Sequence, residues 1–112
     1  MASATTIFIP GLLCTEYLFY YQRDAMPGGA VFADTRQHDT MTAMAEAALA
    51  QAPGQLIPIG LSMGGYVALE MARLAPSRIS AMALLSTSCR QDNAAQRAYR
   101  EQAIKLAGQD GF

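Results

Sequence analysis

The sequence lacks an excess of either charge and lacks any long apolar run. Lysine and arginine number 8 and aspartate and glutamate 9, so we expect no basic surface that would bind a nucleic acid. The first residues, MASATTIFIPGLLC, carry no positive segment, and Pro10-Gly11 soon breaks their apolar run. This pattern predicts neither a signal peptide nor a membrane-spanning helix, and favours a cytoplasmic protein without membrane contact.

Cysteine and histidine are also scarce. Cys14 and Cys89 are too few and too far apart for a disulfide framework or a metal-ligand cluster. We therefore expect two reduced, mostly buried thiols and no bound metal. His38 is the only histidine, so a side-chain imidazole could act at that one position alone.

Apolar residues are plentiful by contrast. They make up 52% of the chain against 15% for charged residues, a composition that predicts a folded core and excludes disorder. The length of 112 residues fits one small domain over residues 1–112. No repeat, linker or low-complexity segment divides it.

Short apolar segments alternate with helical patterns along the chain. Strands are expected at residues 5–9, 30–34, 55–61 and 79–85, with Pro58 as a local irregularity in the third. Helices are expected at residues 16–22, at 40–52 with a cap at Asp39 or Thr40, at 64–74, and from Asp92 or Asn93 to Gly108. This alternation predicts an α/β fold, a parallel sheet of about four strands that helices cover on both faces.

Gly60-Leu61-Ser62-Met63-Gly64 is a G-x-S-x-G motif at the junction of the third strand and the next helix. Small residues around the serine allow a sharp turn that lifts its hydroxyl above the sheet edge. The positive end of the helix points to the same place. We interpret Ser62 as a candidate nucleophile and the Met63 N–H as an oxyanion donor. The alternative is that the glycines only allow close packing and that Ser62 caps the helix.

A second oxyanion donor is expected from the loop after the first strand. Pro10-Gly11-Leu12 occupies that position, and the glycine permits a close approach of the main chain. The Leu12 N–H is the candidate donor at this place.

Four segments together resemble the α/β-hydrolase family, in particular bacterial members with PGLLC and GLSMGG motifs. "IFIPGLLC" is similar to the oxyanion strand and loop, "FADTRQHD" to a D-x-R-x-H segment, "LSMGGYVALE" to the nucleophile region and "RLAPSRISAMALLSTS" to the helix end and strand that follow. The resemblance matches the N-terminal half of the family's fold. It implies a serine hydrolase for a small carboxylic ester or thioester that needs no cofactor.

The family's serine is followed along the chain by an acid and then a histidine from later loops. We expect this sequence to lack both, and a serine without a base is a weak nucleophile. His38 lies upstream, one strand away from Ser62, and its catalytic use stays an open alternative. Asp34 and Asp39 are interpreted as loop and cap residues, and Asp92 as a helix cap.

A four-stranded sheet of this kind leaves unpaired edges, one of them at residues 79–85. We expect a homo-oligomer, such as a homodimer, formed through that edge or through an exchanged helix. Three hypotheses remain: a serine hydrolase, a non-catalytic self-associating half-fold, and a chain whose acid and base come from a separate polypeptide. Tyr17, Phe19 and Tyr20 either line an acyl pocket or belong to the core.

Overall fold

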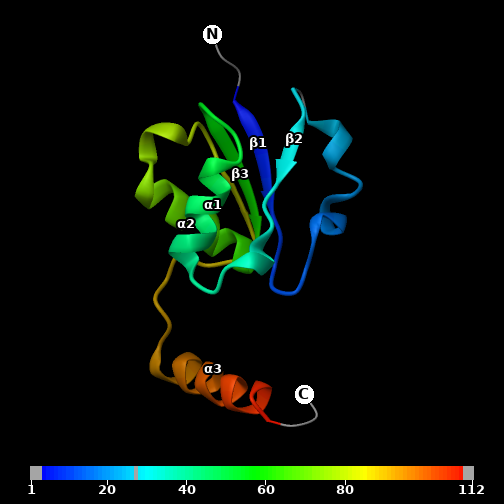
Figure 1. Cartoon of the computed structure of the whole chain (residues 1–112). Coiled ribbons are helices and arrows are strands. Elements are labelled where there is room, and N and C mark those ends of the chain that lie inside the picture. The colour runs from blue at the N-terminus through cyan, green and yellow to red at the C-terminus, as the bar shows by residue number, and fades with distance from the viewer. Residues whose placement is uncertain (1–3, 27, 110–112) are drawn as a thin grey trace.

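The computed structural model describes residues 4–26 and 28–109. Within them, β1 (Thr5–Ile9), β2 (Ala30–Phe32), β3 (Leu56–Leu61) and β4 (Ala83–Leu85) form one parallel sheet in the order β2-β1-β3-β4. The α-helices are α1 (Met41–Ala50), α2 (Met63–Leu74) and α3 (Ala94–Ala107), shown in Figure 1. Short 3₁₀ turns are η1 (Glu16–Phe19), η2 (Arg23–Ala25), η3 (Thr35–Gln37) and η4 (Pro76–Arg78). The predicted α/β class with a parallel sheet of about four strands is confirmed.

The segment predicted as a helix at residues 16–22 forms only the short turn η1 at its start, and a separate turn, η2, follows the segment. Thr15 starts η1, because its side chain accepts a hydrogen bond from the Tyr17 N–H. Phe19 is the one buried residue of η1, and its ring stacks on Phe8 with centroids 4.6 Å apart. Since only one side chain enters the core, a longer helix would gain nothing from packing.

The last strand is shorter than the predicted 79–85. Ile79 makes an isolated bridge to Leu56, and pairing resumes only at Ala83, opposite Ile59. Between these points the chain beside β3 contains one more residue than β3 itself. The interruption lies next to Pro58, which has no N–H to donate to a ladder. The predicted irregularity is therefore present, and it shortens β4.

One face of the sheet packs against α1 and α2. Thr40 begins α1, because its hydroxyl accepts a hydrogen bond from the Ala43 N–H at 3.1 Å. The side chains that meet between the sheet and these helices include Ile7, Ile9 and Leu56 from the strands, Met44, Ala45 and Ala48 from α1, and Val67, Ala68 and Met71 from α2. Several of them are alanines, which let the helices lie close to the strands.

The opposite face of the sheet is only partly covered. Residues paired in a parallel register share a face, so Phe32 and Ile59 lie beside Phe8. Phe19 covers Phe8 on this side, whereas Ile59 is only half-buried although β3 is an inner strand. The prediction that helices cover both faces is wrong, because α1 and α2 share one face.

Helix α3 stands apart from the rest of the described chain, beyond the ends of the strands (Figure 1). It buries none of its residues. Asn93 caps it through a reciprocal capping box with Gln96. The predicted cap at Asp92 is wrong, because the Asp92 carboxylate pairs instead with Arg100 at 2.7 Å. Stable caps define where α3 begins, but they do not supply a surface for it to pack on.

Among the described residues, none of the helices combines the length and the apolar character needed to cross a bilayer. Both cysteines are free thiols. Cys89 is exposed and Cys14 only partly buried, so the prediction of mostly buried thiols is wrong. Each cysteine lies in a loop rather than in a core strand or helix, and a loop residue gains little burial in this fold.

Arg78 connects the end of α1 to the start of β3. Its guanidinium donates hydrogen bonds to the carbonyl oxygens of Gly54 and Leu49, both at 2.8 Å, and to that of Ala52. Carbonyl groups at and after the end of a helix lack helical partners. One side chain therefore satisfies three main-chain acceptors and fixes where β3 enters the sheet.

Arg78→Met keeps the aliphatic stem and removes the three donors. We expect it to lower the free energy of unfolding by about 1–3 kcal/mol, because the acceptors lose their partner in a part-buried site. Urea denaturation followed by circular dichroism measures this. Arg97→Met, on the exposed surface of α3, is the matched control and should change the value by less than about 0.5 kcal/mol. An equal loss in both variants would contradict the assignment.

Candidate active site

Ser62 occupies the crossover from β3 to α2. It is exposed, and its main chain has φ 56° and ψ −115°, a strained conformation for any residue with a side chain. The Ser62 N–H donates to Leu85 O and its carbonyl accepts from the Gly65 N–H, both at 2.9 Å. The side chain makes no capping hydrogen bond. The role of a side-chain cap, considered as an alternative for Ser62, is therefore absent, and the hydroxyl is left available at the surface.

Glycines surround this crossover because the main chains touch there. A Cβ on Gly60 would lie 2.2 Å from Gly64 O, and one on Gly64 would lie 2.0 Å from Ile9 O. A Cβ on Gly65 would lie 2.4 Å from Thr87 Cγ2. These distances are far below van der Waals contact, so the first turn of α2 packs directly on the ends of β1 and β3 only while these positions lack side chains.

The loop after β1 lies against Ser62. A Cβ placed on Gly11 would be 3.6 Å from Ser62 Cβ and 3.5 Å from Leu61 O. The loop turns sharply, since the Cys14 N–H donates to Gly11 O at 3.1 Å and Leu13 has φ 63°. The structure thus brings the segment that contains Leu12 beside the serine, as the sequence predicts.

Two main-chain amides near the serine are candidates for an oxyanion hole. In the part of the chain that the structure describes, neither the Leu12 N–H nor the Met63 N–H donates to a main-chain carbonyl. Met63 is the first residue of α2, so its N–H has no helical acceptor and lies at the positive end of the helix. Leu12 is 69% exposed. Both N–H groups are therefore left without a main-chain acceptor among the described residues and can donate to another group.

His38 follows η3 and is exposed. Strand β1 lies between β2 and β3, so the loop that carries His38 is one strand removed from Ser62. At about 4.8 Å per strand spacing, the two main chains are separated by roughly 10 Å. The only histidine of the sequence thus lies in the loop after β2, with β1 between that strand and the strand that leads to Ser62.

Asp34 has a structural role in the same loop. Its carboxylate accepts from the Arg36 N–H at 3.1 Å and pairs with Arg36 Nε at 2.9 Å. These hydrogen bonds hold the pKa of Asp34 well below its usual value and raise the pKa of Arg36. Asp34 therefore caps η3 in the loop after β2. Asp39 is an exposed loop residue, and the prediction that it caps a helix is wrong, because Thr40 caps α1.

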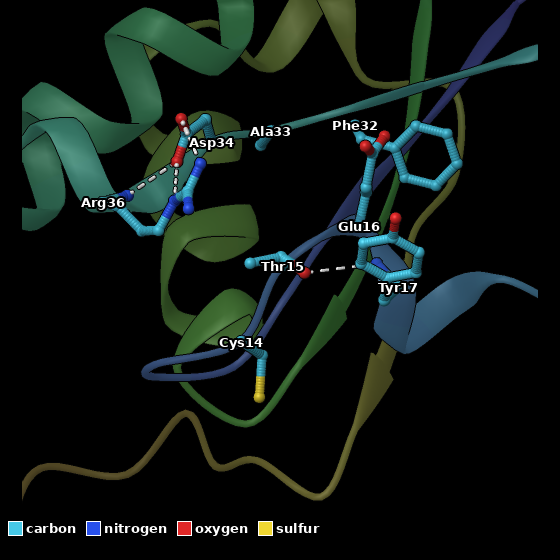
Figure 2. Close-up of a pocket in the computed structure, with 8 residues that line it drawn as sticks. All are labelled: Cys14, Thr15, Glu16, Tyr17, Phe32, Ala33, Asp34 and Arg36. Carbon is cyan, nitrogen blue, oxygen red and sulfur yellow. Dashed lines mark hydrogen bonds and ion pairs between the residues drawn. The ribbon is translucent and has the colours of Figure 1, made fainter.

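A cavity of about 310 Å³ opens beside this edge of the sheet. Figure 2 shows its lining from two loops, the one after β1 and the one after β2. Cys14 lines the cavity and lies on the side of the serine. A Cβ placed on Gly11 would be 3.9 Å from Cys14 Sγ and 3.6 Å from Ser62 Cβ. The lining comprises Cys14, Thr15, Glu16, Tyr17, Phe32, Ala33, Asp34 and Arg36.

The three aromatic residues that the sequence offered for an acyl pocket have different positions. Tyr17 lines the cavity and is 78% exposed, whereas Phe19 is buried in the core. Tyr20 is half-exposed and lies under the Arg23 guanidinium, 4.6 Å from ring centroid to Cζ. Only Tyr17 therefore has a place near the candidate site.

The sequence alone did not single out Thr15 and Glu16 of the cavity, or Thr87. The Thr87 hydroxyl is buried and, among the described residues, has no hydrogen-bond partner. Its side chain packs on Gly65, which ties the end of β4 to the first turn of α2. The signal available in the sequence was positional, since all these residues follow strands whose carboxyl ends meet at one edge.

A model of the alpha/beta hydrolase fold family matches residues 15–109. No curated protein matches the chain in sequence. Among solved structures, an esterase from Thermogutta terrifontis superposes with a TM-score of 0.75 at 22% identity, over 98% of this chain and 46% of the esterase.

Two further solved structures are similar. Est816, described as an N-acyl homoserine lactone degrading enzyme, has a TM-score of 0.69 at 19% identity, over 96% of this chain and 49% of that one. A marine microorganism esterase has a TM-score of 0.64 at 15% identity, over 97% of this chain and 49% of that one. The chain thus spans about half the length of these structures. At identities this low, the similarity concerns the fold alone.

Proposed function

Because the chain belongs to the α/β-hydrolase family, we propose that residues 1–112 form a half domain carrying the nucleophile of a serine hydrolase for a small carboxylic ester or thioester. Ser62 is the nucleophile in this proposal, and the N–H groups of Leu12 and Met63 form the oxyanion hole. The observation that carries the proposal is the strained, exposed crossover at Ser62. The esterases among the similar structures support the reaction class.

The proposed chemistry follows from this geometry. Ser62 Oγ attacks the carbonyl carbon of the ester, and the negative charge that forms on the carbonyl oxygen accepts hydrogen bonds from the two amides. Each such donor contributes about 2.7–4 kcal/mol to transition-state stabilisation in serine hydrolases. The N-terminal end of α2, which carries a partial positive charge, also stabilises the negative charge on this oxygen. The near-neutral charge of the chain supports a small-molecule substrate rather than a nucleic acid.

The proton of Ser62 needs an acceptor during the attack. His38 is the only histidine of the sequence and lies one strand away in the sheet. We therefore propose that an acid and a histidine that are not among residues 1–112 complete the triad. A separate polypeptide is one source of these two groups. Activity that appears only after such a polypeptide is added would identify it.

Labelling with a p-nitrophenyl organophosphonate tests the nucleophile. We expect the adduct on Ser62, located by intact-mass and peptide mass spectrometry, because the oxyanion hole also stabilises the phosphonyl oxygen. It should form slowly in this chain alone and approach one per chain when the acid and the histidine are supplied, because a base must take the serine proton. Ser86 is an internal control, since it is exposed and has φ 51° but does not lie at a helix N-terminus. Equal labelling of Ser86 and Ser62 would contradict the proposal.

The second candidate function is a non-catalytic, self-associating half-fold. The exposed helix α3 and the partly covered sheet face favour it, because both leave apolar groups in contact with water. We therefore propose a homo-oligomer, which is compatible with either function. An absence of phosphonate adduct after long exposure would favour the non-catalytic candidate, and strictly monomeric sedimentation at high concentration would count against self-association.

A further inference from the structure

Strained main-chain conformations gather around Ser62. In the part of the chain that the structure describes, three residues other than glycine have positive φ: Leu13 at 63°, Ser62 at 56° and Ser86 at 51°. Leu13 lies in the loop after β1, and Ser86 comes directly after β4. The carboxyl ends of parallel strands meet at one edge of the sheet, so all three residues lie at the same edge. Strain of this kind persists only where the surrounding structure enforces it, and it clusters at functional sites.

Ser86 leads the chain from the end of β4 onto the beginning of α2. The Ser62 N–H donates to Leu85 O at 2.9 Å, so the last residue of β4 is bonded to the crossover itself. Ser86 follows with its positive φ, and the side chain of the next residue, Thr87, lies on the first turn of α2. The strained turn therefore places Thr87 beside the crossover.

Thr87 fills the space that Gly65 leaves open. A Cβ on Gly65 would lie 2.4 Å from Thr87 Cγ2 and 2.6 Å from both Cβ and Oγ1 of Thr87. The side chain of Thr87 therefore occupies the place that a side chain at position 65 would take, and its methyl carbon lies nearest. Gly65 is buried, and its N–H donates to Ser62 O at 2.9 Å. Thr87 thus packs on the residue that closes the turn after the serine.

The shape of Thr87 makes this contact, and its hydroxyl adds nothing to it. Thr87 Oγ1 is buried and has no hydrogen-bond partner among the described residues, which is unfavourable for a polar group. The branched carbon atoms, by contrast, limit how far Gly65 can move toward β4. Met63 lies two residues before Gly65 in the same helical turn. A limit on the movement of Gly65 therefore also limits the direction of the Met63 N–H.

We propose that Thr87 is a positioning residue for the oxyanion hole. It holds the first turn of α2 so that the Met63 N–H points to the place where the oxyanion forms, without itself contacting the reacting atoms. This inference rests on the function proposed above for Ser62 and Met63. A donor stabilises an oxyanion effectively only when it is fixed in place before the charge appears. A side chain that packs on the donor's own helical turn provides that fixation.

Three variants separate the shape of Thr87 from its hydroxyl. Thr87→Val keeps the branched shape, Thr87→Ser keeps the hydroxyl but loses Cγ2, and Thr87→Ala loses both. The measurement is the rate constant of Ser62 phosphonylation by mass spectrometry, corrected for the folded fraction. Loss of one oxyanion donor costs about 10²–10³-fold in rate, so a loosened donor should cost about tenfold or more in Thr87→Ser and Thr87→Ala, whereas Thr87→Val should stay within about twofold of the native chain.

Thr35→Ala is the matched control. Thr35 is also buried, but it lies in η3 after β2, and β1 separates β2 from the strand that leads to Ser62. Truncation there should lower stability and leave the rate constant of the folded chain unchanged. Equal rate constants in all Thr87 variants would overturn the inference. A rate that is kept in Thr87→Ser and lost in Thr87→Val would also overturn it, because the hydroxyl would then be the active part.

Amide hydrogen exchange in ¹⁵N-labelled chains tests the same inference without any reaction. The Gly65 N–H should exchange about tenfold faster in Thr87→Ala and at the native rate in Thr87→Val, because opening of the turn breaks its hydrogen bond to Ser62 O. Amides within α1 correct for changes in overall stability. Unchanged exchange at Gly65 in Thr87→Ala would overturn the inference. If the native chain formed no Ser62 adduct, the proposed function would fail, and exchange at Gly65 would still decide whether Thr87 holds the turn.

Discussion

Gly64→Ala is expected to destabilise the fold by about 3 kcal/mol or more, which is the largest loss among the substitutions considered. The added Cβ would lie 2.0 Å from Ile9 O and 2.8 Å from Pro10 O. Both atoms belong to the main chain, so no side chain can rotate away to make room. Helix α2 would have to move off β1. Since a domain of this size has about 5–15 kcal/mol of stability in total, urea denaturation should show a large shift in midpoint.

The same substitution should also remove the reactivity of Ser62. Its crossover is bounded by Gly64 and by the main chain of β1, so displacement of α2 separates the serine from the Leu12 and Met63 amides. Phosphonate labelling of the fraction that remains folded measures this effect separately from stability. Gly108→Ala is the matched control, because φ is −82° there and the nearest atoms are at 3.6 Å or more. A similar loss in both variants would contradict the close-contact explanation.

The local signals of the sequence predicted the region around Ser62 well. The β-rich segment 5–9 is β1 as predicted, and the apolar spacing of 64–74 is the body of α2. Both are short-range patterns, and each agrees with what the neighbouring elements need. The G-x-S-x-G spacing also predicted the sharp crossover, because glycines two positions before and after the serine leave room for a tight turn from strand to helix.

Features that depend on packing could not be predicted in the same way. The spacing of Ala95, Tyr99 and Leu106 indicates an apolar side of α3, but it does not say which surface covers that side. The alternation of strands and helices suggested helices on both faces. It does not show which face of the sheet each linker leads to, so the prediction failed there. The cavity beside Tyr17 likewise forms between two loops that are separated in the sequence, so no local pattern of residues predicts that they lie together.

Ser62 itself combines reactivity with main-chain strain, and these two properties can be separated by substitution. Ser62→Ala removes the hydroxyl and keeps a side chain at φ 56°. Ser62→Gly removes both the hydroxyl and the strain, since glycine adopts positive φ freely. Relief of about 1–3 kcal/mol of strain exceeds the entropic cost of glycine, about 0.5–1 kcal/mol. We therefore expect Ser62→Gly to be more stable than Ser62→Ala by about 1 kcal/mol, as measured by urea denaturation.

Both variants should lose the phosphonate adduct completely, because neither can form the bond from oxygen to phosphorus. A side chain at this crossover would then cost stability relative to glycine, which is the relation expected where strain is retained for function. Equal stability of Ser62→Ala and Ser62→Gly would show that the crossover is unstrained. An adduct that persists in both would place the reactive group elsewhere in the chain, and the two measurements fail independently.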